Sequence, residues 1–479
     1  MYILPYYAIS ALHLIGFSFV NSIKLLLSIE YIFSGITMYY WVKSQWGKKA
    51  GFIAGIFYQF APFHLVDLHF SNDIAHMMTY ALIPLNFLLV EKIVETENIK
   101  FVLLQAGLLT LLITSHQAIA LWAFAFIICY AFLLYWKVYK KNVKGIIYFI
   151  CSSVLGLLLS IFYWLPILFY SKYIFQGANA SIDFEKTYLF LFSPWRMGFL
   201  FQGPRGQLSF VIGYMQILVF FVAIFFLRKL KEKTRKYSSY FFIFSSLFAF
   251  FMSQQISKSI WEIIPLIKNF QYSYRLVLPI SFCLATIGGI FSRYISNKFL
   301  IIICTLTILS TILNWGNRRT IPEIGDKELQ HELLSGYTPT NIVIKPKWVG
   351  QKEFYDFQSS PSKKPLEILN GSAQILAISR TTSKHEYLIN AQSQATLKEN
   401  TFYFPGWDLK INNNPYPINY LDKQFPGIIT FKLNKGLYRA ELSFTDTKIR
   451  QVYSWISLTS LIAMIAFAIT YYLRRSRSI

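Results

Sequence analysis

Long apolar runs separated by short polar stretches make up most of the chain. The runs are continuous, and several approach or exceed the roughly 17–25 apolar residues with which a helix crosses a bilayer. A porin-type barrel would instead show short alternating segments. The pattern therefore predicts transmembrane helices. The predicted spans are residues 24–42, 50–66, 74–93, 101–114, 117–136, 145–171, 209–228, 239–254, 276–292, 299–315 and 452–473.

Residues 2–20 are ambiguous, because this stretch fits either a span or a helix lying on the membrane surface. The expected total is therefore about eleven or twelve spans. The runs 101–114 and 239–254 are short enough to be re-entrant.

The polar stretch from 316 to 450 follows a different pattern. Asn-Gly, Pro-Gly and Lys-Gly turns separate short runs such as AQILAISR, IITFKL and YRAELSF, which are typical of strands. Short strands with closely spaced turns predict a small β-sandwich. The expected fold is therefore mainly α: a polytopic transmembrane helical bundle at 1–315, a mainly β domain at 316–450, and a terminal transmembrane helix with a basic tail at 451–479.

Composition and charge placement support this interpretation. Hydrophobic residues make up 54% of the chain and charged residues only 14%, which excludes a water-soluble protein of this length. The 46 Lys and Arg residues against 23 Asp and Glu would fit nucleic acid binding. However, the basic runs WVKSQWGKK, KVYKK, RKLKEKTRK and RRSR lie at every second connection between spans, which is the positive-inside pattern. We expect no nucleic acid partner, and a β-sandwich on the extracytoplasmic side.

The stretch HLVDLHFSNDIAH, residues 64–76, concentrates titratable side chains in one outward-facing turn. The spacing of His64 with Asp67, and of Asp73 with His76, places each pair on one side of a helix end. One interpretation is a carboxylate site in which Asp67 or Asp73 acts as general base or holds a divalent cation, Mg²⁺ or Mn²⁺. The alternative is a solvated polar turn. A dedicated zinc site is disfavoured, because no HExxH or Cys/His framework accompanies these residues.

Other polar residues are expected on the same face. The topology places His116 and the segment ending in Arg275 there, so that His64, His69, His76 and His116 would shape one substrate site. Arg275 either pairs with a lipid phosphate or only extends to the interface.

Glu30 lies within a predicted span, where an acid costs about 2.5 kcal/mol or more on insertion scales. We expect it either to join this site or to be neutralised by Lys24.

Several motifs, taken in order, resemble a bacterial membrane family. FYQFAPFHLVDLHFSNDIAHMMTYALIPLNFLL and IPLIKNFQYSYR resemble elements of multi-pass proteins of the GT-C glycosyltransferase superfamily, labelled 6-pyruvoyl-tetrahydropterin synthase related. FYFPGWDLKINN and the terminal span with its basic tail resemble the end of YfhO-like proteins. The pterin label does not describe the chemistry, because nothing here supplies a three-histidine zinc site for pterin synthesis.

The resemblance implies a glycosyltransferase of the bacterial cytoplasmic membrane. Such an enzyme moves a sugar from a polyprenyl-phosphate donor to an envelope glycan or lipid acceptor on the outer side, usually with inversion. By resemblance, Asp67 matches the family aspartate, and Gln271 and Arg275 match its Gln and Arg, with Arg275 a candidate for the phosphate. The lipid bilayer, the donor and the acceptor are the expected partners. The sandwich would help to hold the acceptor through Trp407, although a tryptophan after Pro-Gly is as often a core residue.

Two departures from the family pattern affect this expectation. The family glutamate falls at His76 and its arginine near Ser71, so that Asp73 would serve as the second acid. In addition, MYILPYYAISALHLIGF resembles the region just after the first external loop, which carries a key acid in GT-C enzymes. The resemblance therefore predicts either an N-terminally truncated enzyme or a catalytically silent envelope scaffold. A lipid-linked-sugar transporter is a further alternative.

Overall fold

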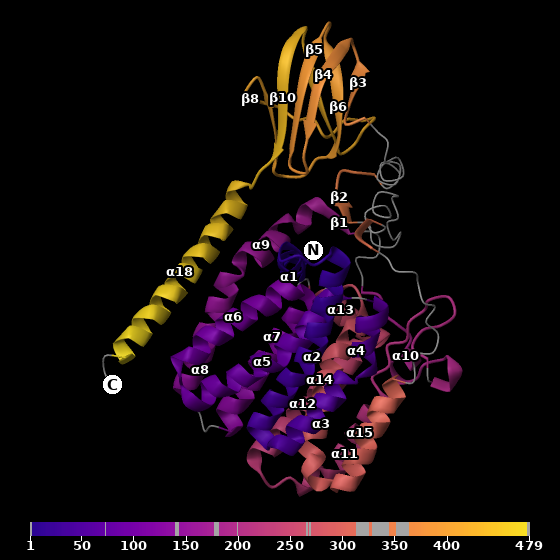
Figure 1. Ribbon diagram of the computed structural model, residues 1–479, viewed down its shortest axis with the longest axis vertical. Coiled ribbons are helices and arrows are strands. Elements are labelled where there is room, and N and C mark those ends of the chain that lie inside the picture. The colour runs from indigo at the N-terminus through magenta and orange to yellow at the C-terminus, as the bar shows by residue number, and fades with distance from the viewer. Residues whose placement is uncertain are drawn as a thin grey trace. The chain divides into compact units, whose positions relative to one another are not determined.

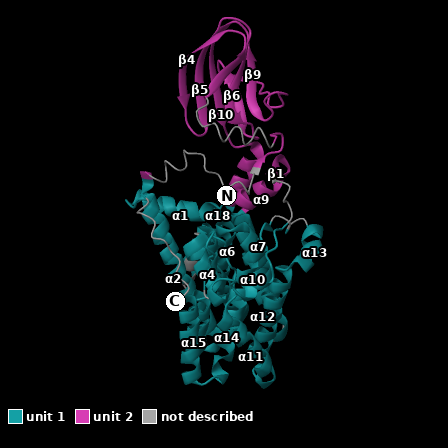
Figure 2. Cartoon of the chain, turned by 90° about the vertical axis from the view of Figure 1, so that its right-hand side faces the viewer, with its two compact units in different colours: residues 1–160, 179–326, 458–479 teal, residues 161–178, 327–457 magenta. Residues whose placement is uncertain are grey.

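The chain forms two compact units in a computed structural model (Figure 2). Met1–Ser160, Asn179–Asp326 and Leu458–Ile479 form the first, here called the helical unit, and Ile161–Ala178 and Lys327–Ser457 form the second, here called the β unit. The structure describes residues 2–71, 73–138, 143–176, 182–198, 200–264, 267, 270–312, 325–327, 344–350 and 364–476. The end of the predicted span 299–315, and residues 316–324, 328–343 and 351–363 of the predicted β domain, lie outside the described residues.

The helical unit is built from helices, most of them connected by short turns, with a longer segment at residues 192–213 between α10 and α11 (Figure 1). Its helices are α1 (Ile3–Leu14), α2 (Phe19–Trp46), α3 (Lys48–Gln59), α4 (Pro62–Val66), α5 (Ile74–Thr96), α6 (Ile99–Ser115), α7 (Gln117–Leu133), α8 (Val143–Leu159), α10 (Tyr188–Leu191), α11 (Tyr214–Phe226), α12 (Lys233–Met252), α13 (Lys258–Ile263), α14 (Val277–Phe291) and α15 (Asn297–Ile312). Helix α9 (Ile161–Tyr170) belongs to the β unit, and α18 (Lys448–Ser476) continues from the β unit into the helical unit.

The helices confirm the predicted multi-pass, mainly helical membrane architecture. Among the described residues, five helices are long and apolar enough to cross a membrane, or up to eight spans if each of three bent helix pairs counts as one. Helices α1, α6 and α15 are apolar but shorter. The five are Phe19–Trp46, Ile74–Thr96, Gln117–Lys137, Ser273–Tyr294 and Lys448–Tyr471.

The predicted single span 50–66 is a bent pair in the structure. Helix α3 ends at Gln59, and the chain turns by 47° into the segment that begins at Pro62. Proline has no backbone N–H to donate and fixes φ, so it fits the first turn of a new helix better than a helix interior. The bend places the turn after α4 beside the start of α5, where the candidate site residues lie.

The predicted span 145–171 is also divided. Helix α8 ends at Leu159 and α9 starts at Ile161. The Phe162 N–H donates to Ser457 Oγ at 3.1 Å, next to the break. A side-chain acceptor can satisfy a backbone N–H where a helix is interrupted.

Helix α14 forms the centre of the helical unit, because every one of its residues is buried. Close packing against α3 requires small residues: a Cβ at Gly289 would lie 2.8 Å from the Ala50 carbonyl oxygen. Small residues let membrane helices approach closely. Phe282 of α14 stacks on Trp41 of α2, with ring centroids 4.9 Å apart.

The β unit contains a sandwich of two antiparallel sheets, as predicted. A five-stranded sheet has the order β4-β5-β10-β7-β8, and a three-stranded sheet has the order β3-β6-β9. A short pair, β1 (Ile174–Gln176) with β2 (Ile344–Pro346), precedes it. The sandwich strands are β3 (Leu366–Asn370), β4 (Ala373–Arg380), β5 (Lys384–Ala391), β6 (Ala395–Phe402), β7 (Trp407–Ile411), β8 (Asn414–Tyr416), β9 (Ile428–Leu433) and β10 (Gly436–Phe444).

Alternation along the strands builds the sandwich core. In β5 every second residue from His385 is buried, while Lys384 and Leu388 on the other face are exposed. Successive side chains of a strand point to opposite faces, so this register gives one core face and one outer face. Trp407 packs against the core, next to His385 and Phe444. Its position fits the core-residue alternative named above.

Leu397→Ala should lower the free energy of unfolding of the sandwich by about 2–5 kcal/mol, because it removes a fully buried side chain from the core. Leu388→Ala is the matched control: Leu388 is 36% exposed, so we expect a change within about 0.5 kcal/mol. Hydrogen exchange of the strand peptides in the full chain measures both. Equal protection in the two variants would contradict the assigned register.

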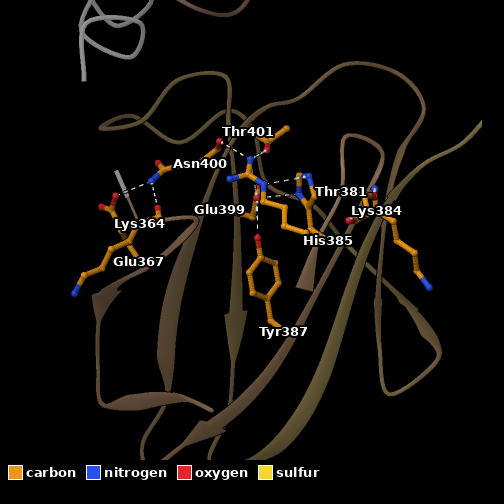
Figure 3. Close-up of polar contacts among 10 residues, drawn as sticks. Lys364, Glu367, Thr381, Lys384, His385, Tyr387, Glu399, Asn400 and Thr401 are labelled. Carbon is orange, nitrogen blue, oxygen red and sulfur yellow. Dashed lines mark hydrogen bonds and ion pairs between the residues drawn. The ribbon is translucent and has the colours of Figure 1, made fainter. Parts of the chain in front are cut away.

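A buried polar network lies within the sandwich (Figure 3). Glu399 of β6 is fully buried, and its Oε1 accepts a hydrogen bond from the Tyr387 hydroxyl at 2.9 Å. His385 Nδ1 lies 2.9 Å, and an Arg380 guanidinium nitrogen 3.5 Å, from the same oxygen. Burial and the Glu399 carboxylate raise the pKa of Tyr387, so its hydroxyl remains a donor. The network joins β4 and β5 of one sheet to β6 of the other.

Candidate functional site

The HLVDLHFSNDIAH segment folds as a short helix, a turn and the start of a long helix. After α4, residues Asp67–Ser71 form one π-helical turn, and α5 starts at Ile74. Asp73 is the N-cap of α5, and its side chain accepts the His76 N–H at 3.0 Å. A π-turn is rare and is frequently found at functional sites. Here it turns Asp67 towards the first turn of α5.

Asp67 and His76 form a buried pair. Asp67 Oδ2 lies 3.2 Å from His76 Nδ1, and both side chains are almost completely buried. Asp73 Oδ2 lies 3.6 Å from the same nitrogen, and its side chain is 29% exposed. His76 Nε2 has no hydrogen-bond partner among the described residues. Two carboxylates therefore converge on one imidazole, and Asp73 connects the group to the surface.

His116 joins this group from another pair of helices. It lies between α6 and α7, where its Nδ1 accepts the Ile119 N–H at 3.2 Å and caps α7. Its ring centroid lies 4.6 Å from that of His76 and 4.1 Å from the stacked ring of Tyr2. Asp73, His76 and His116 can each present one ligand atom within 4.8 Å of the other two. This trio differs from the predicted metal ligands, Asp67 and Asp73, in its two imidazoles.

Arg275 supplies the positive charge. Its guanidinium interacts electrostatically with Asp67, His76 and His116. One of its NH₂ groups donates to the Phe270 carbonyl at 2.6 Å and to Gln271 Oε1 at 3.1 Å. The side chain is 7% exposed, so Arg275 does not simply extend into solvent. Gln271 therefore helps to orient the guanidinium.

The backbone around Gln271 is held in an unusual conformation. Gln271 has φ +71°, which is uncommon for a residue with a side chain. Its carbonyl accepts the Asp183 N–H at 2.7 Å, and the Ser273 N–H donates to the Asp183 carbonyl at 2.9 Å. Such strain persists where surrounding contacts over-determine it, often at functional sites. The loop around Asp183 thus fixes the segment that carries Arg275.

Glu30 of α2 interacts electrostatically with Asp73. The side chain is buried, and neither carboxylate oxygen has a hydrogen-bond partner in the described part of the chain. Among the described residues Glu30 forms no ion pair with Lys24, and its electrostatic interaction with Asp73 favours the alternative in which it contributes to the site. A buried carboxylate without a partner is costly, and such residues in membrane helices mark functional sites by default.

The remaining predicted histidines lie differently. His64 is fully buried, its Nδ1 donates to the Tyr58 carbonyl at 3.1 Å, and its ring stacks on Tyr80 at 3.8 Å. It packs in an aromatic core and is not paired with Asp67 as the spacing indicated. His69 lies half-buried in the π-turn.

Sequence reasoning did not identify Tyr2 or Asp183 as site residues. Tyr2 stacks on His116 and interacts electrostatically with Arg275 and Asp73. Tyr2 lies in the stretch MYILPYYAISALHLIGF, but neither that resemblance nor any periodic pattern assigned Tyr2 or Asp183 to the site, so the tertiary fold is what reveals them. For the loop that contains Asp183, the available signal was the predicted topology, which puts this loop on the same side of the membrane as the HLVDLHFSNDIAH turn.

Comparison of the sequence with known proteins identifies the family to which the chain belongs. Neither the curated proteins nor the solved structures include a match to this chain. A family model described as a 6-pyruvoyl-tetrahydropterin synthase related domain, a membrane protein, matches residues 2–317. That match covers well over half of the chain and includes every candidate site residue. The chain therefore belongs to the 6-pyruvoyl-tetrahydropterin synthase related family of membrane proteins.

Proposed function

We propose that the protein transfers a sugar from a polyprenyl-phosphate donor to an envelope glycan or lipid acceptor, on the outer side of the bacterial cytoplasmic membrane. One observation carries the proposal: Asp67 and His76 form a buried pair, and the buried side chains of Arg275 and Glu30 interact electrostatically with Asp67 and Asp73 respectively. Burying charged groups costs free energy, so such groups inside a membrane protein are candidates for a functional role.

The chemistry of the transfer matches this combination of groups. An acceptor hydroxyl oxygen forms a bond to the anomeric carbon while the bond from that carbon to the phosphate oxygen breaks. The polyprenyl phosphate leaves with the bonding electron pair, and the hydroxyl proton passes to a carboxylate. The reaction therefore needs a base for one substrate and a cation for the charge that develops on the other.

Arg275 is the candidate for stabilising the leaving phosphate. Its Nε–H has no partner among the described residues, although the side chain is buried. A guanidinium is always charged and binds phosphate oxygens with paired N–H donors. Its Nη1 donates to the Phe270 carbonyl and to Gln271 Oε1, so the guanidinium is already oriented and loses little conformational entropy when a phosphate binds.

Glu30 is the best candidate for the base. Oδ2 of Asp67 contacts His76, while Oδ1 of Asp73 caps α5 and its Oδ2 approaches His76, so each of these acids already has a polar contact. Glu30 has two oxygens without partners. A base must be within hydrogen-bond reach of the proton it takes, and a free carboxylate can turn towards a bound hydroxyl. Asp67 and Asp73 then hold His76 and set the charge of the site.

Sugar transfer by the purified chain in lipid vesicles tests this function. The substrates are a polyprenyl-phosphate donor with a labelled sugar and an envelope glycan acceptor. We expect labelled glycan from the wild type. In Asp67→Asn the rate of transfer should fall by about 10–100-fold, because asparagine holds His76 less firmly than the carboxylate does. Asp422→Asn, in a turn of the β unit where Asp422 accepts the Gln424 N–H, is the matched control and should not change transfer.

Two outcomes would contradict the proposal. Labelled lipid that crosses the vesicle membrane without transfer would indicate the transporter alternative. Folded wild-type protein that neither transfers nor transports the label would indicate the scaffold alternative.

A further inference from the structure

We propose that Asp73, His76 and His116 form a binding site for one divalent transition-metal ion, with Asp67 beside His76. The existence of the site is independent of the activity proposed above, but its role in sugar transfer rests on that proposal. The sequence indicated a cation at Asp67 or Asp73 but not the two histidine ligands, because the ligands come from two separate segments, the start of α5 and the α6–α7 junction.

The separations between the polar atoms fit the edges of a coordination shell. Metal bonds of about 2.0–2.2 Å to histidine nitrogen and carboxylate oxygen give ligand–ligand distances of about 3.3–3.6 Å in a tetrahedral site. Asp67 Oδ2 and Asp73 Oδ2 lie 3.2 Å and 3.6 Å from His76 Nδ1. A charge-assisted N–H···O⁻ hydrogen bond is shorter, about 2.7–2.9 Å. The 3.2 Å contact is a hydrogen bond between His76 and Asp67, whereas the 3.6 Å separation from Asp73 is too long for one and fits two ligands of the same ion.

His116 completes the ligand set. It belongs, with Asp73 and His76, to the group whose ligand atoms come within 4.8 Å of one another. Its Nε2 is buried and has no partner among the described residues. Coordination through Nε2 requires the neutral tautomer with hydrogen on Nδ1, so the 3.2 Å bond from the Ile119 N–H would be given up. That bond is long, and the α7 cap it provides is weak.

The charge balance also favours a divalent cation. When ionised, Asp67, Asp73 and Glu30 carry three negative charges, and Arg275 offsets one of them. Two negative charges remain in a largely buried site, which is unfavourable without compensation. One divalent ion would neutralise them.

The donor types select the kind of metal. Two imidazoles and one carboxylate suit Mn²⁺, Co²⁺ or Zn²⁺, whereas Mg²⁺ prefers oxygen ligands and retains several waters. Of the two ions expected from the sequence, Mg²⁺ and Mn²⁺, this ligand set therefore favours Mn²⁺, and it also suits Co²⁺ and Zn²⁺. Such an ion would supply a second positive charge for the donor phosphate.

Titration of the purified full chain with Co²⁺ tests the site, with any polyhistidine tag removed. We expect visible ligand-field bands that saturate at about one ion per chain, are displaced by Zn²⁺ and are not displaced by Mg²⁺. Asp73→Asn and His116→Gln should weaken Co²⁺ binding at least about 10-fold. His69→Gln is the matched control, because His69 lies in the same turn but outside the metal-ligand group, and its Co²⁺ affinity should match that of the wild type.

A second measurement needs no variant and so does not depend on variant folding. X-ray absorption of Co²⁺ bound to the wild type should show scattering from imidazole rings. Absence of binding, binding without imidazole scattering, or equal affinity in folded His116→Gln would each overturn the proposal. Metal binding without sugar transfer would support the metal site and reject the proposed function. Sugar transfer by a chain that binds no Co²⁺ would support the proposed function and reject the metal site.

Discussion

Glu30→Gln should lower the rate of sugar transfer by about 10²–10⁴-fold, the usual contribution of a positioned general base. Glutamine keeps the size and polarity of the side chain but cannot accept the hydroxyl proton. Because both oxygens of Glu30 lack partners in the described structure, the substitution breaks no observed hydrogen bond. The loss should therefore appear in kcat, with little change in the amount of folded protein.

Glu91→Gln is the matched control for this experiment. Glu91 is also a buried carboxylate in a candidate span, but its Oε1 accepts a hydrogen bond from the Tyr130 hydroxyl. A glutamine oxygen can accept the same bond, so transfer should change by no more than a few-fold. Transfer measured in vesicles at saturating donor compares the two variants. Equal losses in both would contradict a special role for Glu30.

Glu399→Ala should destabilise the sandwich by about 3–5 kcal/mol, because it removes one member of a buried ion-pair network. Tyr387 and His385 would each lose a contact with Glu399 (Figure 3), and so would Arg380. Arg380 would keep its bonds to the Asn400 carbonyl and Thr401. Its charge would then lack the buried carboxylate that balances it.

Glu441→Ala tests whether burial is the cause. Glu441 lies on the outer face of β10 and pairs with Lys384 at 3.2 Å, with its side chain 24% exposed. Ion pairs near the surface contribute about 0–1 kcal/mol, so this variant should be nearly as stable as the wild type. Hydrogen exchange of β5 and β6 peptides in the full chain reports both variants. Similar protection in Glu399→Ala and Glu441→Ala would show that the buried network contributes little.

Hydrophobic patterning predicted the fold class because it follows directly from the environment of each segment. The strand run IITFKL coincides with β9, and AQILAISR coincides with β4. The breaks within predicted spans were not foreseen. A run such as 145–171 remains apolar throughout, and the bond from the Phe162 N–H to Ser457 beside the break is a tertiary contact that the run itself does not indicate.

The candidate site shows a similar division. The i, i+3 spacing predicted that Asp73 and His76 would meet, and they do so at 3.6 Å. The same spacing also indicated His64 with Asp67, yet the π-turn rotates Asp67 towards His76, nine positions later. Spacing rules assume a regular helix, so a single π-turn changes which side chains share a face. The contributions of Tyr2 and Asp183 depend on packing between distant segments, which periodicity does not encode.

The most direct test of the central claim locates the donor. A polyprenyl-phosphate sugar with a photoreactive group next to its phosphate would be cross-linked to the wild type in vesicles, with excess unlabelled donor as competitor, and the modified peptides identified by mass spectrometry. We predict cross-links within residues 64–80, 114–119 and 270–276 that disappear when excess unlabelled donor is added. Competable cross-links confined to the β unit, or to helices that carry none of the site residues, would contradict it.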